Sequence, residues 1–293
     1  MTILLALVAA LLFALGNVLQ QRIAMRFPDR LANSALFLPR LCREPVWLLG
    51  TAVICLGFGF HAGALSSGEI VVVQPILALT LVLALPLGAR LSAQRIERRD
   101  AAAAIVVTLA LGVFLLLSDP AEGIDDPAAA AWIVAAAAVL VPTALLTVAG
   151  LRARPSLKAA LVGTAAGVIF GLHGALVKAM VAEFDDGVLG PLSSWELYAV
   201  LAGAVVGMTI GQISLQAGDL PPAIATQSIA TPVVGVVLGV ALFEEAIHDT
   251  AAGTLASVVA LAVMMAGTGA LAYRNGGATD SPAAEAQSTS GSG

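Results

Sequence analysis

Nine separate stretches of this sequence are each apolar for long enough to cross a lipid bilayer, and no other feature constrains the fold as strongly. A transmembrane helix needs about 20 mostly apolar residues. Only 11% of the 293 residues are charged, whereas about 25% is usual in a soluble domain. The sequence therefore predicts an all-α membrane protein. The nine predicted spans are residues 3–20, 46–65, 70–90, 101–118, 128–149, 159–182, 195–216, 221–243 and 250–273.

The connections between the spans differ in length and composition. Residues 66–69 separate the second and third spans, and residues 217–220 separate the seventh and eighth, so each pair is predicted to form a tight helical hairpin. Residues 275–293 are small and polar, which predicts a disordered cytoplasmic tail. No lysine or arginine precedes the first apolar stretch, so we expect a retained first helix rather than a cleaved secretory signal.

The positive charges predict how the chain is oriented in the membrane. Cytoplasmic loops of membrane proteins are enriched in lysine and arginine. With the N-terminus outside, all of the 14 lysines and arginines except Lys178 fall in inner connections, whereas the outer connections carry acidic residues. The sequence therefore predicts an N-out, C-in protein. A composition rich in alanine, glycine and arginine is typical of a high-GC bacterium, so we expect the bacterial inner membrane.

An internal repeat relates the first and sixth spans. The segment LLALVAALLFALGNVLQQRIAMRFPD from Leu4 aligns without gaps with LVGTAAGVIFGLHGALVKAMVAEFDD from Leu161. Small residues four apart let helix backbones approach closely in lipid. Such stripes coincide in the alignment, and a third lies in the seventh span: Ala6, Ala10 and Ala14; Gly163, Gly167 and Gly171; Gly203, Gly207 and Gly211. The alternative is that helices of alanine, leucine, valine and glycine resemble one another by composition alone.

The repeat extends over four spans in each half, with one helix between the halves. TLVLALPLGARL from Thr80 matches TPVVGVVLGVAL from Thr231. Because a single helix lies between the halves, they must cross the membrane in opposite directions. Arginines follow the third span where glutamates follow the eighth, as inversion requires. The sequence predicts nine transmembrane helices as two inverted four-helix repeats, residues 1–118 and 157–274, joined by one central helix within residues 119–156.

These features together resemble the drug/metabolite transporter (DMT) superfamily. The resemblance rests on the inverted nine-helix architecture, on the G-E hairpin at Gly68 followed by Gln74-Pro75, and on T-P-x-x-G-x-x-x-G from Thr231. The odd helix count is more similar to the NIPA-like, magnesium-transporter branch than to the ten-helix EamA-like branch. The resemblance covers most of residues 3–273 and implies small-molecule transport, without specifying the substrate.

Polar side chains inside the predicted spans are the candidates for a binding site, because such groups are costly in lipid and line cavities or pair internally. The third and eighth spans also carry Pro75 and Pro232, and inverted-repeat transporters usually hold their substrate beside interrupted helices near the bilayer midplane. No catalytic residue, metal site or cofactor is predicted. The predicted substrate-binding residues are Asn17, His61, Gln74, His173, Lys178, Gln212, Gln227 and Thr231.

The sequence leaves a structural alternative open for several of these residues. Gln74 and Gln227 form an inverted pair that either holds a solute from both sides or bonds carbonyl groups freed by the prolines. His173 is either a proton relay or anion ligand, or a neutral packing residue. Lys178 lines the cavity, snorkels to the outer headgroups or pairs with Glu183.

The sequence favours a secondary transporter, with export expected, that moves a small neutral or anionic metabolite by alternating access at the interface of the two repeats. No aspartate or glutamate lies near the middle of a predicted span, which argues against a cationic substrate. Two alternatives stay open. One is a NIPA-like transporter of magnesium or another divalent cation, and the other is a non-transporting membrane scaffold or lipid-pathway accessory protein.

The remaining expectations concern catalysis and partners. The chain contains no GxxxxGK, HExxH or GxSxG motif, so we expect no enzyme activity. The expected partners are a small-molecule substrate and the lipid bilayer, and a homodimer is left open. A net charge of −5 gives no basic face for nucleic acid, which is not expected as a partner.

Overall fold

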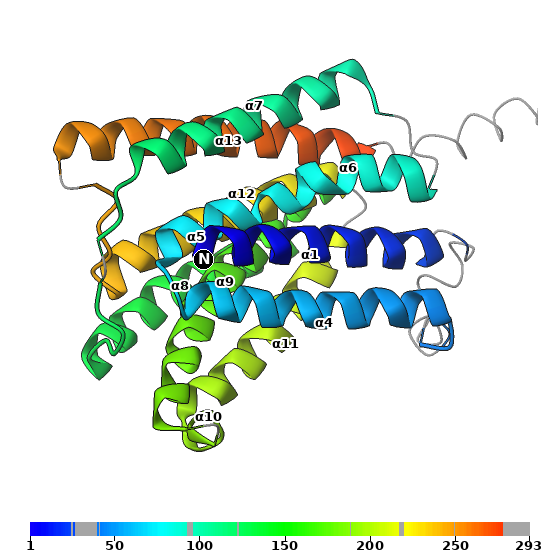
Figure 1. Cartoon of the computed structure of the whole chain (residues 1–293). Helices are drawn as coiled ribbons and strands as arrows, with labels where there is room; N and C mark the ends of the chain where they lie inside the picture. Colours follow the sequence, from blue (N-terminus) through cyan, green and yellow to red (C-terminus); the bar gives the residue numbers. More distant parts are fainter. Residues whose placement is uncertain are drawn as a thin grey trace, which may run out of the picture.

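The computed structural model describes residues 1–24, 26, 40, 42–92, 96–121, 123–187, 189–216, 220–248 and 250–277. Within these ranges the protein is helical, and nine segments are long and apolar enough to span a membrane (Figure 1). The prediction of a multi-pass helical membrane protein is therefore confirmed. The helices are α1 (Thr2–Ala24), α4 (Pro45–Leu65), α5 (Ile70–Leu77), α6 (Leu79–Ser92), α7 (Arg98–Leu117), α8 (Ala129–Leu151), α9 (Pro155–Ala182), α10 (Gly190–Ser193), α11 (Trp195–Leu215), α12 (Leu220–Leu242) and α13 (Ala251–Gly277).

The third predicted span consists of two helices, α5 and α6, with Ala78 between them. The span predicted over residues 70–90 is confirmed as the candidate membrane span Ile70–Leu91, with an interruption at Ala78. Pro75 has no N–H group and cannot continue the regular hydrogen-bond ladder, and the amide of Ala78 donates to the carbonyl of Pro75 in a tighter turn, at 3.2 Å. In α12, by contrast, the helix runs unbroken through Pro232. There the Thr231 hydroxyl donates to the carbonyl of Gln227 at 3.0 Å, one residue before the Ser228 carbonyl that Pro232 leaves without its usual N–H donor.

Each half of the chain is organised around its first helix. Helix α1 packs against α4 and against the broken pair α5 and α6, and α9 packs in the same way against α11 and α12. The short connection between α4 and α5 is as predicted; α4 packs chiefly on α1, and α5 packs on α12 and α1. The predicted tight connection between the second and third spans is therefore confirmed. Residues 217–219, in the second connection, lie outside the described residues.

Small residues explain how closely the helices approach α9. A Cβ atom added at Gly167 would lie 2.7 Å from the Cβ of Ala230, and one added at Gly171 would lie 2.6 Å from the Cβ of Val234, both on α12. The predicted role of the glycine stripe in close helix packing is confirmed. The aligned alanines of α1 are fully buried: Ala6, Ala10 and Ala14.

The two halves share one core. Helix α5 packs against α12, and α7 lies alongside α13 (Figure 1). One hydrophobic cluster extends across these contacts, since the fully buried Ile76 of α5, Phe114 of α7 and Met264 of α13 all belong to it. Helix α9 is the most deeply buried of the nine spans.

The N-terminus and several connections meet at one end of the bundle, which we call the N-terminal end. The Thr2 hydroxyl donates to the carbonyl of Ser67 at 2.5 Å. The amide of Ile124 donates to the carbonyl of Phe243 at 2.7 Å, which ties the connection after α7 to the one after α12. At the chain terminus α13 extends through Gly277, so the first three residues of the predicted tail are helical; residues 278–293 lie outside the described residues.

Candidate functional site

The eight residues predicted to bind substrate do not converge on one site. The four buried residues are His61, Gln74, His173 and Lys178. Gln227 and Thr231 are half-buried, and Asn17 and Gln212 are exposed. Asn17 and Gln212 thus lie on exposed faces of their helices, and their contact with a substrate stays a prediction. Each follows a glycine that packs against a neighbouring helix, and consecutive helical residues do not face the same way. The small residue faces the interior and the polar one faces outward.

The clearest polar feature is a buried ion pair between α9 and the segment that follows α12. The Nζ of Lys178 lies 2.6 Å from Oε1 of Glu245, and the two residues are only 7% and 1% exposed. The same ammonium group lies 5.1 Å from the ring centroid of Phe243. The predicted snorkelling of Lys178 and its pairing with Glu183 are both wrong, because a carboxylate from a distant segment holds the ammonium group inside the bundle.

Glu245 also binds the N-terminus of α5. Its Oε1 and Oε2 accept hydrogen bonds from the backbone N–H groups of Ile70 and Val71, each at 2.9 Å. The first N–H groups of a helix have no partner within it, and the partial positive charge there favours a carboxylate. Two local features place Glu245: Glu244 has a φ of 57°, and a Cβ at Gly239 would lie 2.6 Å from Oε2 of Glu245. The turn at Glu244 and the lack of a side chain at Gly239 together leave space for the carboxylate of Glu245.

Gln74 lies at the same junction of α5, α9 and α12. A Cβ at Gly235 of α12 would lie 2.5 Å from the Cγ of Gln74, and one at Gly174 of α9 would collide with its amide nitrogen. Gln227 has other neighbours, since its Oε1 lies 3.8 Å from a Cβ built on Gly211 of α11. Eight residues of α12 separate Gln227 from Gly235, which is about 12 Å of helix. The structure thus does not bring the two amides together as the inverted pair that the sequence predicts.

The two buried histidines lie in an aromatic layer between α1, α4 and α9. Ring centroids are 6.3 Å apart for Phe13 and His61, 5.0 Å for Phe13 and Phe58, and 6.4 Å for Phe58 and His173. Both ring nitrogens of His61 and the Nδ1 of His173 are buried without a hydrogen-bond partner among the described residues. Both roles that the sequence left open for His173, packing and ligand or proton binding, stay predictions.

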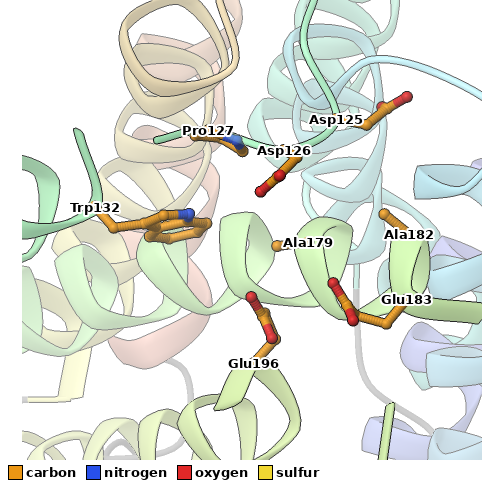
Figure 2. A pocket seen from close by; sticks show the side chains of 8 residues that line it. All are labelled: Asp125, Asp126, Pro127, Trp132, Ala179, Ala182, Glu183 and Glu196. Carbon is orange, nitrogen blue, oxygen red and sulfur yellow. The ribbon is translucent and has the colours of Figure 1, made fainter. Parts of the chain in front are cut away.

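A cavity of about 250 Å³ lies beside the ion pair, between the connection that precedes α8 and helices α8, α9 and α11 (Figure 2). Figure 2 shows the carboxylates of Asp126, Glu183 and Glu196 directed toward a common space, whereas Asp125 points away from it. We call this space the acidic pocket. Its lining contains four acidic residues and no basic one: Asp125, Asp126, Pro127, Trp132, Ala179, Ala182, Glu183 and Glu196.

Aromatic rings separate the acidic pocket from the ion pair. Trp132, in the pocket wall, makes edge-on contacts with Trp195 and Phe243, at 5.2 and 6.0 Å between ring centroids. Phe243 in turn lies beside the ammonium group of Lys178. The pocket, the aromatic rings and the ion pair therefore form a continuous series of contacts at the N-terminal end of the bundle.

The sequence reasoning missed Glu245 as a site residue. Nothing in the local sequence distinguishes it from Glu244, which is exposed and precedes it in the same connection. The signal that could have found it is Lys178, because a lysine within a span needs a carboxylate or carbonyl partner if it does not reach water.

The fold and the site define a multi-pass helical membrane protein with a buried ion pair and an acidic pocket at one end. The chain is 33% identical to the uncharacterized protein Cgl0250/cg0304 of Corynebacterium glutamicum over 276 residues, which cover 92% of this chain and 94% of that protein. It therefore belongs to the same family as this corynebacterial protein. No family model and no solved structure matches the chain.

Proposed function

We propose that this protein is a secondary transporter of the bacterial inner membrane that moves a small polar metabolite by alternating access between two inverted halves. The observation that carries the proposal is the Lys178–Glu245 ion pair at the N-terminus of the broken third span. Inverted-repeat transporters place their binding sites beside interrupted helices whose N-terminal ends point at charged groups. Ionisable side chains buried in membrane proteins commonly mark the route of a substrate or ion.

The packing of the helices supports two equivalent halves. Helix α1 has α4 on one side and α5 with α6 on the other, and α9 has α11 and α12 as its counterparts. The last helices of the two halves, α7 and α13, pack against each other, as an approximate two-fold relation would require. This arrangement is consistent with the DMT-like architecture and with the N-out, C-in orientation proposed from the charges.

The proposed charge of the solute differs from the one expected from the sequence. The expectation of a neutral or anionic metabolite rested on the lack of a carboxylate near the middle of any span. Glu245 lies at the end of α12, yet it is buried against α5 and α9, and the pocket beside it is acidic. These observations favour a cationic solute. A directly bound divalent metal gains less support, because the described residues contain no cluster of three His, Cys, Asp or Glu side chains able to hold one.

Transport by the purified protein in liposomes tests the proposal. Glu245→Gln and Lys178→Met are the test variants, and Glu244→Gln, which changes the exposed neighbour, is the matched control. We expect at least one solute from a panel of labelled amines, amino acids, sugars and organic acids to be taken up by the wild type and by the control. Uptake should fall at least about tenfold in folded ion-pair variants.

Two results would count against the proposal. One is a wild-type protein that moves no member of the panel under an imposed solute or proton gradient. The other is unchanged uptake by both ion-pair variants, since the ion pair would then have no part in transport.

A further inference from the structure

Glu196 is a buried residue whose carboxylate opens onto the acidic pocket and has no partner among the described residues. It lies in the first turn of α11, is only 8% exposed, and makes no hydrogen bond or ion pair with any other described residue. Figure 2 shows its carboxylate directed into the pocket. The N-terminus of α11 stabilises a negative charge there, but no hydrogen bond joins the carboxylate to another residue in the described part of the chain. Buried charges in proteins are normally paired, so the pocket itself is the place from which a positive partner would come.

The residues around Glu196 add further negative charge and no positive charge. The carboxylate of Asp126 is directed into the same cavity of about 250 Å³, and none of the eight lining residues is basic. Lys178, the cation in the adjoining part of α9, is already bound to Glu245 and lies behind the ring of Phe243. A concave site lined by charges of one sign concentrates ions of the opposite sign.

The geometry favours an organic cation over a metal ion. The pocket carboxylates do not form a three-ligand cluster suited to a metal within the described part of the chain. Trp132 supplies an aromatic wall, and the face of an indole ring attracts ammonium groups. The pocket volume of about 250 Å³ lies just below the range of roughly 300–1,000 Å³ that is usual for drug-sized ligands. The ligand that fits is a small amine.

We infer that the acidic pocket binds a small organic ammonium ion, with Glu196 and Asp126 as its ion-pairing carboxylates and Trp132 as its aromatic wall. This inference rests on the proposed function, because it names the substrate class of the same transporter and its binding site at the N-terminal end. The ammonium group supplies the positive charge that Glu196 lacks, and the apolar part of the amine packs against Trp132 and Ala179.

Calorimetric titration of the purified full-length protein in a non-ionic detergent tests the inference. The probe is 1,4-diaminobutane, and 1,4-butanediol, succinate and MgCl₂ serve as neutral, anionic and metal controls. We expect saturable binding of the diamine that weakens as salt is added, with no comparable binding of the three controls. Glu196→Gln and Asp126→Asn should each weaken diamine binding at least about tenfold. Asp119→Asn should change it less than about twofold, because that exposed residue of the same connection as Asp126 is not among the residues that line the pocket.

The inference is overturned if the wild type does not bind the diamine, if MgCl₂ binds as well as the diamine, or if folded Glu196→Gln and Asp126→Asn variants bind like the wild type. Asp126 lies in a connection rather than in a helix, so its variant keeps the test decisive if Glu196→Gln does not fold. The titration tests this inference and the liposome assay tests the proposed function, so their results can be told apart. Diamine binding without transport of any solute overturns the proposed function, whereas transport without diamine binding overturns only this inference.

Discussion

Replacing Glu245 with glutamine should lower the free energy of unfolding in detergent by about 3–5 kcal/mol, the usual cost of removing one partner from a buried ion pair. The carboxylate accepts from three donors, the N–H groups of Ile70 and Val71 and the ammonium group of Lys178. A glutamine amide offers one oxygen and an NH₂ group, so at least one donor would face another donor. Lys178 would then remain buried without its counter-charge.

The double variant Lys178→Met/Glu245→Gln separates the ion pair from general damage to the packing. It removes both charges and leaves none uncompensated, so it should be less destabilised than the sum of the two single variants, with a coupling energy of about 1–3 kcal/mol. Helical circular dichroism during heating provides the measurement. At roughly 2–4 °C per kcal/mol, the single Glu245 variant should unfold on the order of 10 °C below the wild type.

The matched control is Glu244→Gln, which changes the same functional group one residue away on an exposed side chain. It should alter the free energy of unfolding by no more than about 0.5 kcal/mol. The reasoning is refuted if Glu245→Gln is no more destabilised than this control. It is also refuted if the losses in the two single variants simply add in the double variant, because the two charges would then not interact.

Two further predictions concern the helix contacts and the orientation. Gly171→Ala should lower the free energy of unfolding by about 1–3 kcal/mol, because the added methyl group would lie 2.6 Å from a side chain of α12. Gly112 has nothing within 4 Å of an added Cβ, so Gly112→Ala should be neutral or raise the free energy of unfolding by up to about 1 kcal/mol in the same assay. The orientation can be tested by cysteine labelling in a Cys55→Ser background. A cysteine introduced at Ser67 should react with a membrane-impermeant maleimide in intact cells, while the native Cys42 should react only after lysis. The reverse order of labelling would exclude the N-out orientation.

The membrane spans could be predicted from the sequence because each depends on a local run of apolar residues. Their boundaries agree with the structure to within about four residues, as for the first span, predicted as 3–20 and observed as Thr2–Ala24. The break at Ala78 is less predictable, since both Pro75 and Pro232 lie within apolar spans and only the first interrupts its helix. The two prolines have the same local chemistry, so the difference depends on how the neighbouring helices hold each segment, which the local sequence does not show.

The site was harder to predict, because a polar residue in a membrane span does not by itself indicate the buried face. In α1 and α11 the buried face is marked by small residues, and the adjacent Asn17 and Gln212 are exposed. Lys178 was recognised as a candidate, but its partner lies 67 residues further along the chain, and the helix that the same carboxylate caps begins 175 residues before it. No local pattern encodes contacts at such separations.

The same chemistry occurs on both sides of the aromatic contact between Trp132 and Phe243. On one side Glu245 is buried and paired with the ammonium group of Lys178. On the other side Glu196 is almost as deeply buried, and the described residues supply no such group to it. Burying a carboxylate is unfavourable unless a positive group pairs with it, and Lys178 shows which group this protein uses for that purpose. An ammonium ion in the acidic pocket would do for Glu196 what Lys178 does for Glu245.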